Sequence, residues 1–422
     1  MKKAVFAILF LCAAAGAQSP LSLQYPLGMP GLAVSGVSAA LAGGGTAVVD
    51  EYLGTSLNPA NAAIGDRSTF SALVSFDMTH ISDDGGSDAV SGYMPRLLSL
   101  IIPIGRAGNL GFSMQKRSDA NLNFYTTEEL RGGGPGEYRS VTIELYRSGG
   151  MTSWQGGWAF RFKNGLSLGL AYERLYYNMD SRETFESTFR YDLEESSPSF
   201  TSSVYEKAAS NFASDGIRFG MQVPVHERVT LGAAAEYVFP GSGNGRWKRE
   251  YHAAAVDSSE RGYSVSLPPS INIGAAYRPD DRWLLAADAS ATLWERYENG
   301  DPGAPSRDAQ RTYAVSAGAC FVPAANALSS AYWEKIRYSA GLRYATLPLP
   351  QDGPAAGGAR EYSLSVGAGL PIPNESGVVD LVLDVGRRTD ARFAGYGENI
   401  VKFQLGINGG RNWFQKEKSR NY

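Results

Sequence analysis

The chain has 422 residues, which is enough for one large domain or two of ordinary size. Its 39 Lys and Arg residues stand against 42 Asp and Glu residues, and this mild negative balance gives no reason to expect nucleic acid as a partner. The 49 glycines follow no collagen period, and aromatic residues make up 11% of the chain. A collagen-like or nucleic-acid-binding protein is therefore disfavoured from the start.

The first residues, MKKAVFAILFLCAAAGAQS, have the form of a secretory signal peptide. Lys2 and Lys3 form a positive start, residues 5–15 are apolar, and residues 15–17 make a small-residue cleavage site. The apolar stretch is shorter than the ~20 residues of a membrane-spanning helix. We expect residues 1–17 to be removed, which leaves 37 basic against 42 acidic residues and Cys320 as the one cysteine. A lone cysteine forms no internal disulfide.

Residues 18–66 are small, glycine-rich and moderately apolar, with no clear strand before residue 68. Gly43, Gly44 and Gly45 are not followed by Gly-Lys-Ser/Thr, so they form no phosphate-binding loop and favour close packing or a hinge. Asn58 and Pro59 favour a turn. Such a turn would also fix the exit of this segment into the first strand, and the two interpretations are compatible.

From residue 68 onward, apolar residues occupy every second position. Ile271 and Ile273 alternate with Ser270 and Asn272, a period typical of a strand with one apolar face. The pattern recurs at 69–78, 109–115, 157–163, 166–173, 217–223, 230–237, 283–293, 313–321, 336–344, 362–370, 379–385 and 401–408. Residues 97–104 are apolar on both faces, which suits a strand packed on both sides. We count about fourteen strands, most near the ~9–11 residues of a tilted bilayer crossing.

The connections between these strands are of two kinds. Short ones lie at 105–108, 164–165, 224–227, 279–282 and 371–376, while long polar ones lie near 79–93, 119–150, 181–212, 241–266, 297–308, 346–359 and 388–397. They alternate along the chain, as the periplasmic turns and external loops of outer-membrane barrels do. An even strand count is also typical of single-chain bacterial barrels.

A soluble β-sandwich or propeller would show the same alternation. The faces opposite the apolar stripe carry many charges, which a barrel would enclose in a wet lumen: Arg218, Glu236, Asp288, Arg337, Arg343, Asp380, Asp384 and Lys402. Periodicity alone does not separate these folds. The export signal, the strand parity and the loop asymmetry favour an all-β, transmembrane antiparallel barrel of about fourteen strands.

Three stretches resemble the FadL/TodX family of outer-membrane transporters. GGGTAVVDEYLGTSLNPANAA (residues 43–63) resembles that family's N-terminal hatch, with Asn58, Pro59 and Ala60 matching an Asn-Pro-Ala-Gly-like motif and Asn61 standing where the family usually has Gly. Two later stretches resemble the central hairpins of that family: LPPSINIGAAYRPDDRWLLAADASATLWERY and RFGMQVPVHERVTLGAAAEYVF. The resemblance implies a hatch at 18–66 that plugs the lumen of a barrel at 67–414.

The end of the chain is different. The last strand is expected to finish at Trp413 and Phe414, before a polar tail at 415–422, where a fatty-acid channel typically ends on the aromatic residue. This ending resembles PorV-like relatives, which share the barrel but serve protein secretion or unknown roles. Tryptophans such as Trp158, Trp283 and Trp294 lie near strand ends, where aromatic girdles meet the membrane surface.

No motif indicates catalysis. His80, His226 and His252 are far apart, show no metal-ligand spacing, and stand in no nucleophile-base arrangement. We expect no enzyme activity, no metal and no cofactor.

The family resemblance implies a passive, porin-like transporter in the bacterial outer membrane, surrounded by its lipid, that takes up hydrophobic compounds. Long-chain fatty acids are the leading substrates of that family. A basic group would bind the carboxylate, and Arg96 and Arg343 are candidates. The alternative is a PorV-like scaffold that transports nothing and serves a protein-secretion partner.

Overall fold

The computed structural model describes residues 27–31, 34–83, 86–131, 137–191, 199–251, 256–300, 310–324, 331–348, 358–372, 376–390 and 396–411. The expected signal peptide at 1–17, the strand end at Trp413 and the tail at 415–422 lie outside these ranges and stay predictions. Among the described residues, no helix has the length and apolar character needed to cross a membrane.

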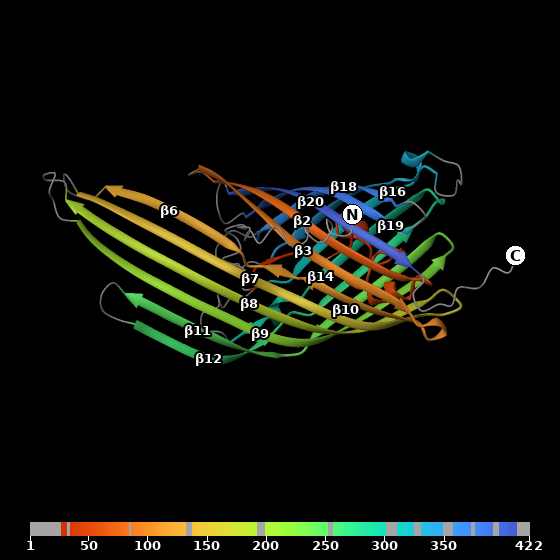
Figure 1. Cartoon of the computed structure of the whole chain (residues 1–422), viewed down its shortest axis with the longest axis horizontal. Coiled ribbons are helices and arrows are strands. Elements are labelled where there is room, and N and C mark those ends of the chain that lie inside the picture. Colours follow the sequence, from red (N-terminus) through yellow and green to blue (C-terminus); the bar gives the residue numbers. More distant parts are fainter. Residues whose placement is uncertain are drawn as a thin grey trace, which may run out of the picture.

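The strands form one closed antiparallel barrel of 14 wall strands, as predicted (Figure 1). The last strand pairs with both its predecessor and the first strand, and this closes the ring. The wall strands are β2 (Ser68–Asp83), β3 (Gly86–Pro103), β4 (Asn109–Lys116), β7 (Glu137–Arg161), β8 (Ser167–Tyr191), β9 (Ser199–His226), β10 (Val229–Val238), β13 (Ser270–Tyr277), β14 (Trp283–Thr292), β16 (Thr312–Phe321), β17 (Arg337–Thr346), β18 (Arg360–Pro371), β19 (Gly377–Thr389) and β20 (Gly397–Arg411).

The apolar stripe of each strand faces outward. Ile271 and Ile273 on β13 are each 56% exposed, and they lie opposite Ala291 and Ala289 of β14. A sandwich would bury such side chains, whereas a barrel in lipid exposes them. The same outward belt continues around the wall through Phe70, Phe112, Leu170, Phe219, Leu231, Val315, Leu342, Leu364, Val385 and Phe403, all exposed.

Several strands are longer than predicted. β7 and β8 have 25 residues each and β9 has 28, so they project well beyond the other wall strands (Figure 1). β6 (Leu122–Arg131), β11 (Gly241–Tyr251) and β12 (Val256–Ser266) extend this projecting sheet. The predicted loops at 79–93, 119–150, 181–212 and 241–266 are therefore wrong, since most of their described residues are strand. Where both faces of a strand meet water, the apolar alternation fades although the ladder of hydrogen bonds continues.

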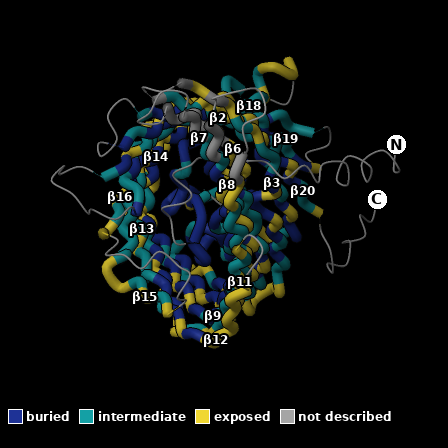
Figure 2. The backbone as a smooth tube through the Cα atoms, turned by 90° about the vertical axis from the view of Figure 1, so that its left-hand side faces the viewer, coloured by how far each residue is buried: buried dark blue, intermediate teal, exposed yellow. Residues whose placement is uncertain are grey.

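Residues 34–66 of the N-terminal segment lie inside the ring (Figure 2). Its short helices contact strands on two sides. Helix α2 (Gly36–Ala40) contacts β17, β18, β19 and β20, and η2 (Pro59–Ala63) contacts β4, β7, β8 and β9. Leu97 packs in a buried cluster with Val34, and Ile101 in one with Ala62. This packing explains why residues 97–104 are apolar on both faces, as predicted.

Candidate functional site

The turn at Asn58 is tied to the barrel wall. Its side chain accepts a hydrogen bond from the amide of Ala60 at 3.0 Å and donates to the carbonyls of Thr46 and Met221, at 2.8 and 3.1 Å. Pro59 occupies the first turn of η2, where the missing N–H leaves no intrahelical bond unmade. Asn58 thus begins η2 and connects it to β9.

Gln222 on β9 makes the other side of this connection, and no local pattern in the sequence marks it. Its amide nitrogen donates to the carbonyls of Thr46 and Val48, both at 3.2 Å, and to the side-chain oxygen of Asn61 at 2.6 Å. Asn61, which stands where the family usually has Gly, therefore uses its side chain to bind the wall.

The glycine run at residues 43–45 packs on an acidic side chain of β14. The carboxylate of Asp288 accepts hydrogen bonds from the amides of Gly45 and Thr46, at 2.9 and 2.8 Å. Gly45 has a φ of 139°, which favours glycine, and a Cβ on Gly44 would lie 2.9 Å from Asp288 Oδ2. Close packing, the first of the two predicted interpretations, describes the glycine run.

Inward-facing glycines let the wall approach the backbone of the N-terminal segment. A Cβ on Gly220 of β9 would come within 2.7 Å of the Pro59 ring and collide with the Asn58 side chain. Other wall glycines meet the segment in the same way: Gly111, Gly169, Gly232, Gly274, Gly318, Gly341 and Gly367. These wall glycines thus line the contact between the wall and the segment.

The inward charges, predicted to face a wet lumen, form networks. Arg218 pairs with Glu236 and donates to the carbonyl of Ser56, while Arg117 pairs with Glu173 and with Glu236 at 2.9 Å. Removal of one member of a buried ion pair is strongly destabilising.

A second network joins β18, β19 and β20: Arg388 pairs with Glu361 at 2.5 Å and with Glu398 at 2.7 Å. Further towards the short turns, Arg337 joins Asp380 of β19 at 2.8 Å to Asp50 of the N-terminal segment at 3.3 Å. Close to where the segment enters β2, Arg67 pairs with Glu51, and its guanidinium donates to the Tyr52 hydroxyl at 3.0 Å. Burial, followed by the charge of Glu51, raises the pKa of Tyr52 to about 12.

A cavity of about 280 Å³ lies in the lumen beside Leu27, Pro30 and Gly31. Its wall combines apolar side chains with charged ones. The apolar part includes Leu27, Val238, Leu267, Trp294 and Leu347, and the charged part Arg117, Glu236, Arg343, Glu361 and Lys402. Trp294, expected in a membrane-surface girdle, lines this cavity instead, whereas Trp158 and Trp283 are exposed near the short turns.

The two candidate arginines differ in their partners. Arg96 is buried and its charge is met by Asp77 of β2. Arg343 makes no salt bridge or hydrogen bond with any residue in the described ranges, and its Nε is buried without a partner. Glu361 and Asp384 are the acids whose charges act on it. Lys402, also unpaired among the described residues, lies in the same cavity wall. Of the two candidates, only Arg343 lines this cavity, and it does so without a direct ion pair to any described residue.

The barrel wall is interrupted next to this cavity. β4 ends at Lys116, and β5 (Ser118–Asp119) turns inward to pair with β1 (Met29–Pro30). Beyond this point β6 pairs with β7, while residues 86–96 of β3 pair with β2 alone among the described strands. A break in the backbone ladder therefore opens beside Met29 and Pro30.

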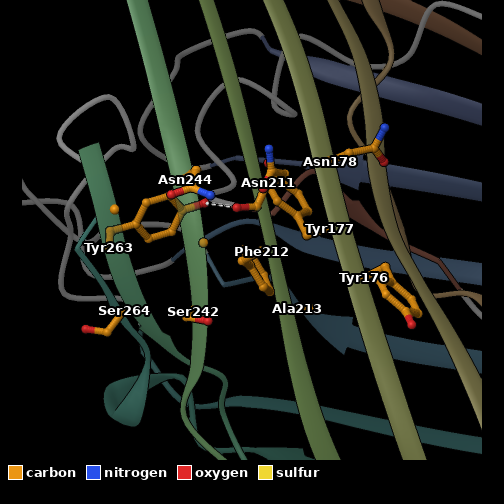
Figure 3. A pocket seen from close by; sticks show the side chains of 12 residues that line it. Tyr176, Tyr177, Asn178, Asn211, Phe212, Ala213, Ser242, Asn244, Tyr263 and Ser264 are labelled. Carbon is orange, nitrogen blue, oxygen red and sulfur yellow. Dashed lines mark hydrogen bonds between the residues drawn. The ribbon is translucent and has the colours of Figure 1, made fainter. Parts of the chain in front are cut away.

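A separate hollow of about 840 Å³ lies across β8, β9, β11 and β12 (Figure 3). Asn178, Asn211 and Asn244 oppose one another in register and are exposed on the outer face, while Tyr177 and Phe212 stack on the inner side with ring centres 4.9 Å apart. Because its exposed rim is polar and lies outside the wall, we do not assign this hollow to the lumen path.

Within the described ranges no group of three or more His, Cys, Asp or Glu side chains could hold a metal ion.

The family model named BamG matches residues 1–420. The chain belongs to the BamG family. None of the curated protein sequences matches it.

Solved structures show which fold this BamG-family chain has. It resembles the CymD monoaromatic hydrocarbon channel (14% identity, TM-score 0.57, 90% of this chain and 98% of that one). It also resembles a Pseudomonas aeruginosa FadL homologue (14%, 0.59, 92% and 99%) and the Ralstonia pickettii toluene transporter TbuX (16%, 0.58, 89% and 98%). The FadL-type fold predicted from the sequence is confirmed. The PorV-like interpretation of the chain end gains no support from these comparisons.

Proposed function

We propose that the protein is an outer-membrane channel for passive passage of hydrophobic small molecules, with the N-terminal segment acting as its hatch. The descriptions of the structural neighbours as hydrocarbon channels and toluene transporters support this class. The observation that carries the proposal is the lumen cavity, which joins apolar side chains such as Leu267 and Trp294 to the guanidinium of Arg343, which has no direct ion pair among the described residues.

The preferred ligand is an amphiphile with one carboxylate, such as a long-chain fatty acid. The apolar wall would receive its chain, since each buried CH₂ contributes about 0.8 kcal/mol. Arg343, with Lys402 nearby, would bind the carboxylate, and Arg96 is the weaker candidate because Asp77 already neutralises it. A hydrogen bond between charged groups contributes about 1.5–3 kcal/mol.

The wall break at β5 offers a way out of the cavity that leaves the hatch in place. The hatch below is bound to the wall through Asn58, Gln222 and Asp288, so a path straight through the lumen would have to break these contacts. A ligand that leaves between β3 and β6 would pass Pro30 and enter the bilayer laterally without displacing them.

The direct test measures binding of oleate and of its methyl ester to the full chain in non-ionic detergent, by the change in tryptophan fluorescence. We expect saturable oleate binding that Arg343→Ala weakens roughly tenfold or more, in line with the loss of one charged hydrogen bond. Binding of the uncharged methyl ester should change little.

Arg228→Ala is the matched control, because Arg228 is an exposed arginine in the short turn between β9 and β10. It should leave both ligands unaffected. Absence of saturable binding in the intact chain would count against transport, whereas equal loss with both variants would count against Arg343 as the carboxylate site.

A second candidate, a scaffold for a protein partner, is favoured by one observation. On the inner face of the projecting sheet, Ile143, Phe185 and Tyr251 lie in one cross-strand row with Val204, and they are 38, 42 and 43% exposed. A photo-crosslinking residue at position 185 should then join a single partner in cells. The same probe at Arg182, on the opposite face, should not. No discrete product at position 185 would remove this candidate.

A further inference from the structure

Two arginines that have no partner among the described residues stand on the outside of the barrel, on the side of the long loops. Arg387 of β19 lies directly opposite Tyr362 of β18, and Arg360 lies two residues further along β18, opposite Thr389. Both are exposed, and neither makes a salt bridge or hydrogen bond with any residue in the described ranges. Diagonal neighbours of this kind are about 7–8 Å apart, so the two guanidinium groups can reach one ligand together.

Below the arginine pair the outer wall is apolar and hollowed. Tyr344 and Tyr362 lie side by side with ring centres 5.1 Å apart. A groove of about 810 Å³ runs beneath them along Val315, Leu342, Leu364, Val385 and Val401, all more than 40% exposed. Asn399, opposite Arg387 on β20, adds an exposed amide at the same level.

From the rim toward the membrane centre, the wall presents charged groups, then aromatic rings, then an apolar groove. A lipid of the outer leaflet has the matching sequence of a charged headgroup, an interface and acyl chains. An arginine guanidinium can donate two parallel hydrogen bonds to a pair of phosphate oxygens, and two neighbouring positive charges complement a phosphate monoester. We propose that Arg360 and Arg387 bind the phosphate of an outer-leaflet lipid whose acyl chains lie in the groove below. The lipid is a structural ligand of the outer wall and does not enter the lumen.

The test uses the full chain in non-ionic detergent, titrated with phosphatidic acid and, separately, with diacylglycerol of the same chains, with binding read by native mass spectrometry. We expect phosphatidic acid to bind the unmodified chain at least tenfold more tightly than diacylglycerol. The double variant Arg360→Gln/Arg387→Gln should lose this preference, and each single variant should lose part of it.

The control variant is Arg106→Gln, which removes the same charge from an exposed turn at the opposite rim. It should keep the preference for phosphatidic acid. Each variant is run on a denaturing gel with and without boiling. Slower migration of the boiled sample than of the unheated one shows that the barrel had folded. Retention of the preference in the double variant would overturn the proposal, as would its equal loss in Arg106→Gln. Displacement of phosphatidic acid by inorganic phosphate at similar concentration would assign the arginines to free phosphate instead.

Discussion

The carboxylate of Asp288 on β14 accepts a 2.8 Å hydrogen bond from the backbone amide of Thr46, 242 residues earlier in the chain. Its other oxygen accepts one from Gly45 at 2.9 Å. One wall side chain thus satisfies two neighbouring backbone donors of the N-terminal segment, in a place where the lumen offers them little water.

Asp288→Ala should loosen the segment without opening the barrel. Loss of the acceptor leaves partly buried donors unsatisfied, at a cost of about 1–3 kcal/mol. Limited digestion with elastase should cut within residues 34–66 faster in this variant, while the strands stay protected. Asp257→Ala, at an exposed position on β12, is the control and should digest like the unmodified chain. Unchanged digestion of Asp288→Ala would show that this contact does not hold the segment.

Gly220→Ala should destabilise the folded protein, because the new methyl group would collide with Asn58 and Pro59. Overpacking of this kind typically costs about 1–3 kcal/mol, and urea unfolding in detergent micelles should show it as a lower midpoint. Gly156→Ala is matched to it, since a Cβ there meets the outer ring of Phe112 at an ordinary 3.6 Å. If both variants unfold at the same midpoint, the wall is not closely packed on the Asn58 turn.

The pair Arg218 and Glu236 should be coupled energetically. Arg218→Leu removes one of two arginines that pair with Glu236 and should cost about 3–5 kcal/mol, the usual result of breaking a buried pair. The double variant Arg218→Leu/Glu236→Leu should cost less than the sum of the two single variants. Additive costs in a double-mutant cycle, measured by urea unfolding, would mean that the two side chains act independently.

The membrane-spanning part of the fold could be predicted from the sequence because lipid and lumen impose opposite demands on successive residues. β13 and β14 show this in Ile271, Ile273, Ala289 and Ala291, which share one outward face. The projecting part of β8 was missed for the same reason. Beyond Tyr177 the outer face carries Asn178, Asp180 and Arg182, so period two no longer separates apolar from polar.

The site could be predicted only in part. The Asn58 turn and the glycine run at 43–45 were visible as local motifs. Their wall partners, Gln222 and Asp288, are single polar residues on strands 160 or more residues away, and nothing local marks them. The wall glycines did carry a usable signal, since Gly220, Gly232 and Gly274 fall on inward positions of adjacent strands. Such a row indicates a backbone passing close by.

The β11–β12 hairpin should be dispensable for barrel assembly, because it extends the sheet beyond the apolar belt. Deletion of residues 245–261 joins Asn244 directly to Gly262, and these two residues face each other at the end of the retained ladder, after the pair Gly243 and Tyr263. Asn-Gly is the preferred sequence of a two-residue hairpin turn. The shortened chain should therefore keep the register of the strands and the packing of Tyr263.

We expect this deletion variant to reach the outer membrane, to keep its heat-dependent gel migration, and to bind oleate like the full chain, since none of the removed residues lines the lumen cavity. The control deletes an equal stretch from the belt, residues 217–233, which removes most of the turn-side half of β9 and the start of β10 and should abolish folding. Failure of the 245–261 deletion to fold would mean that pairing of β11 with β9 beyond the membrane is needed to close the ring.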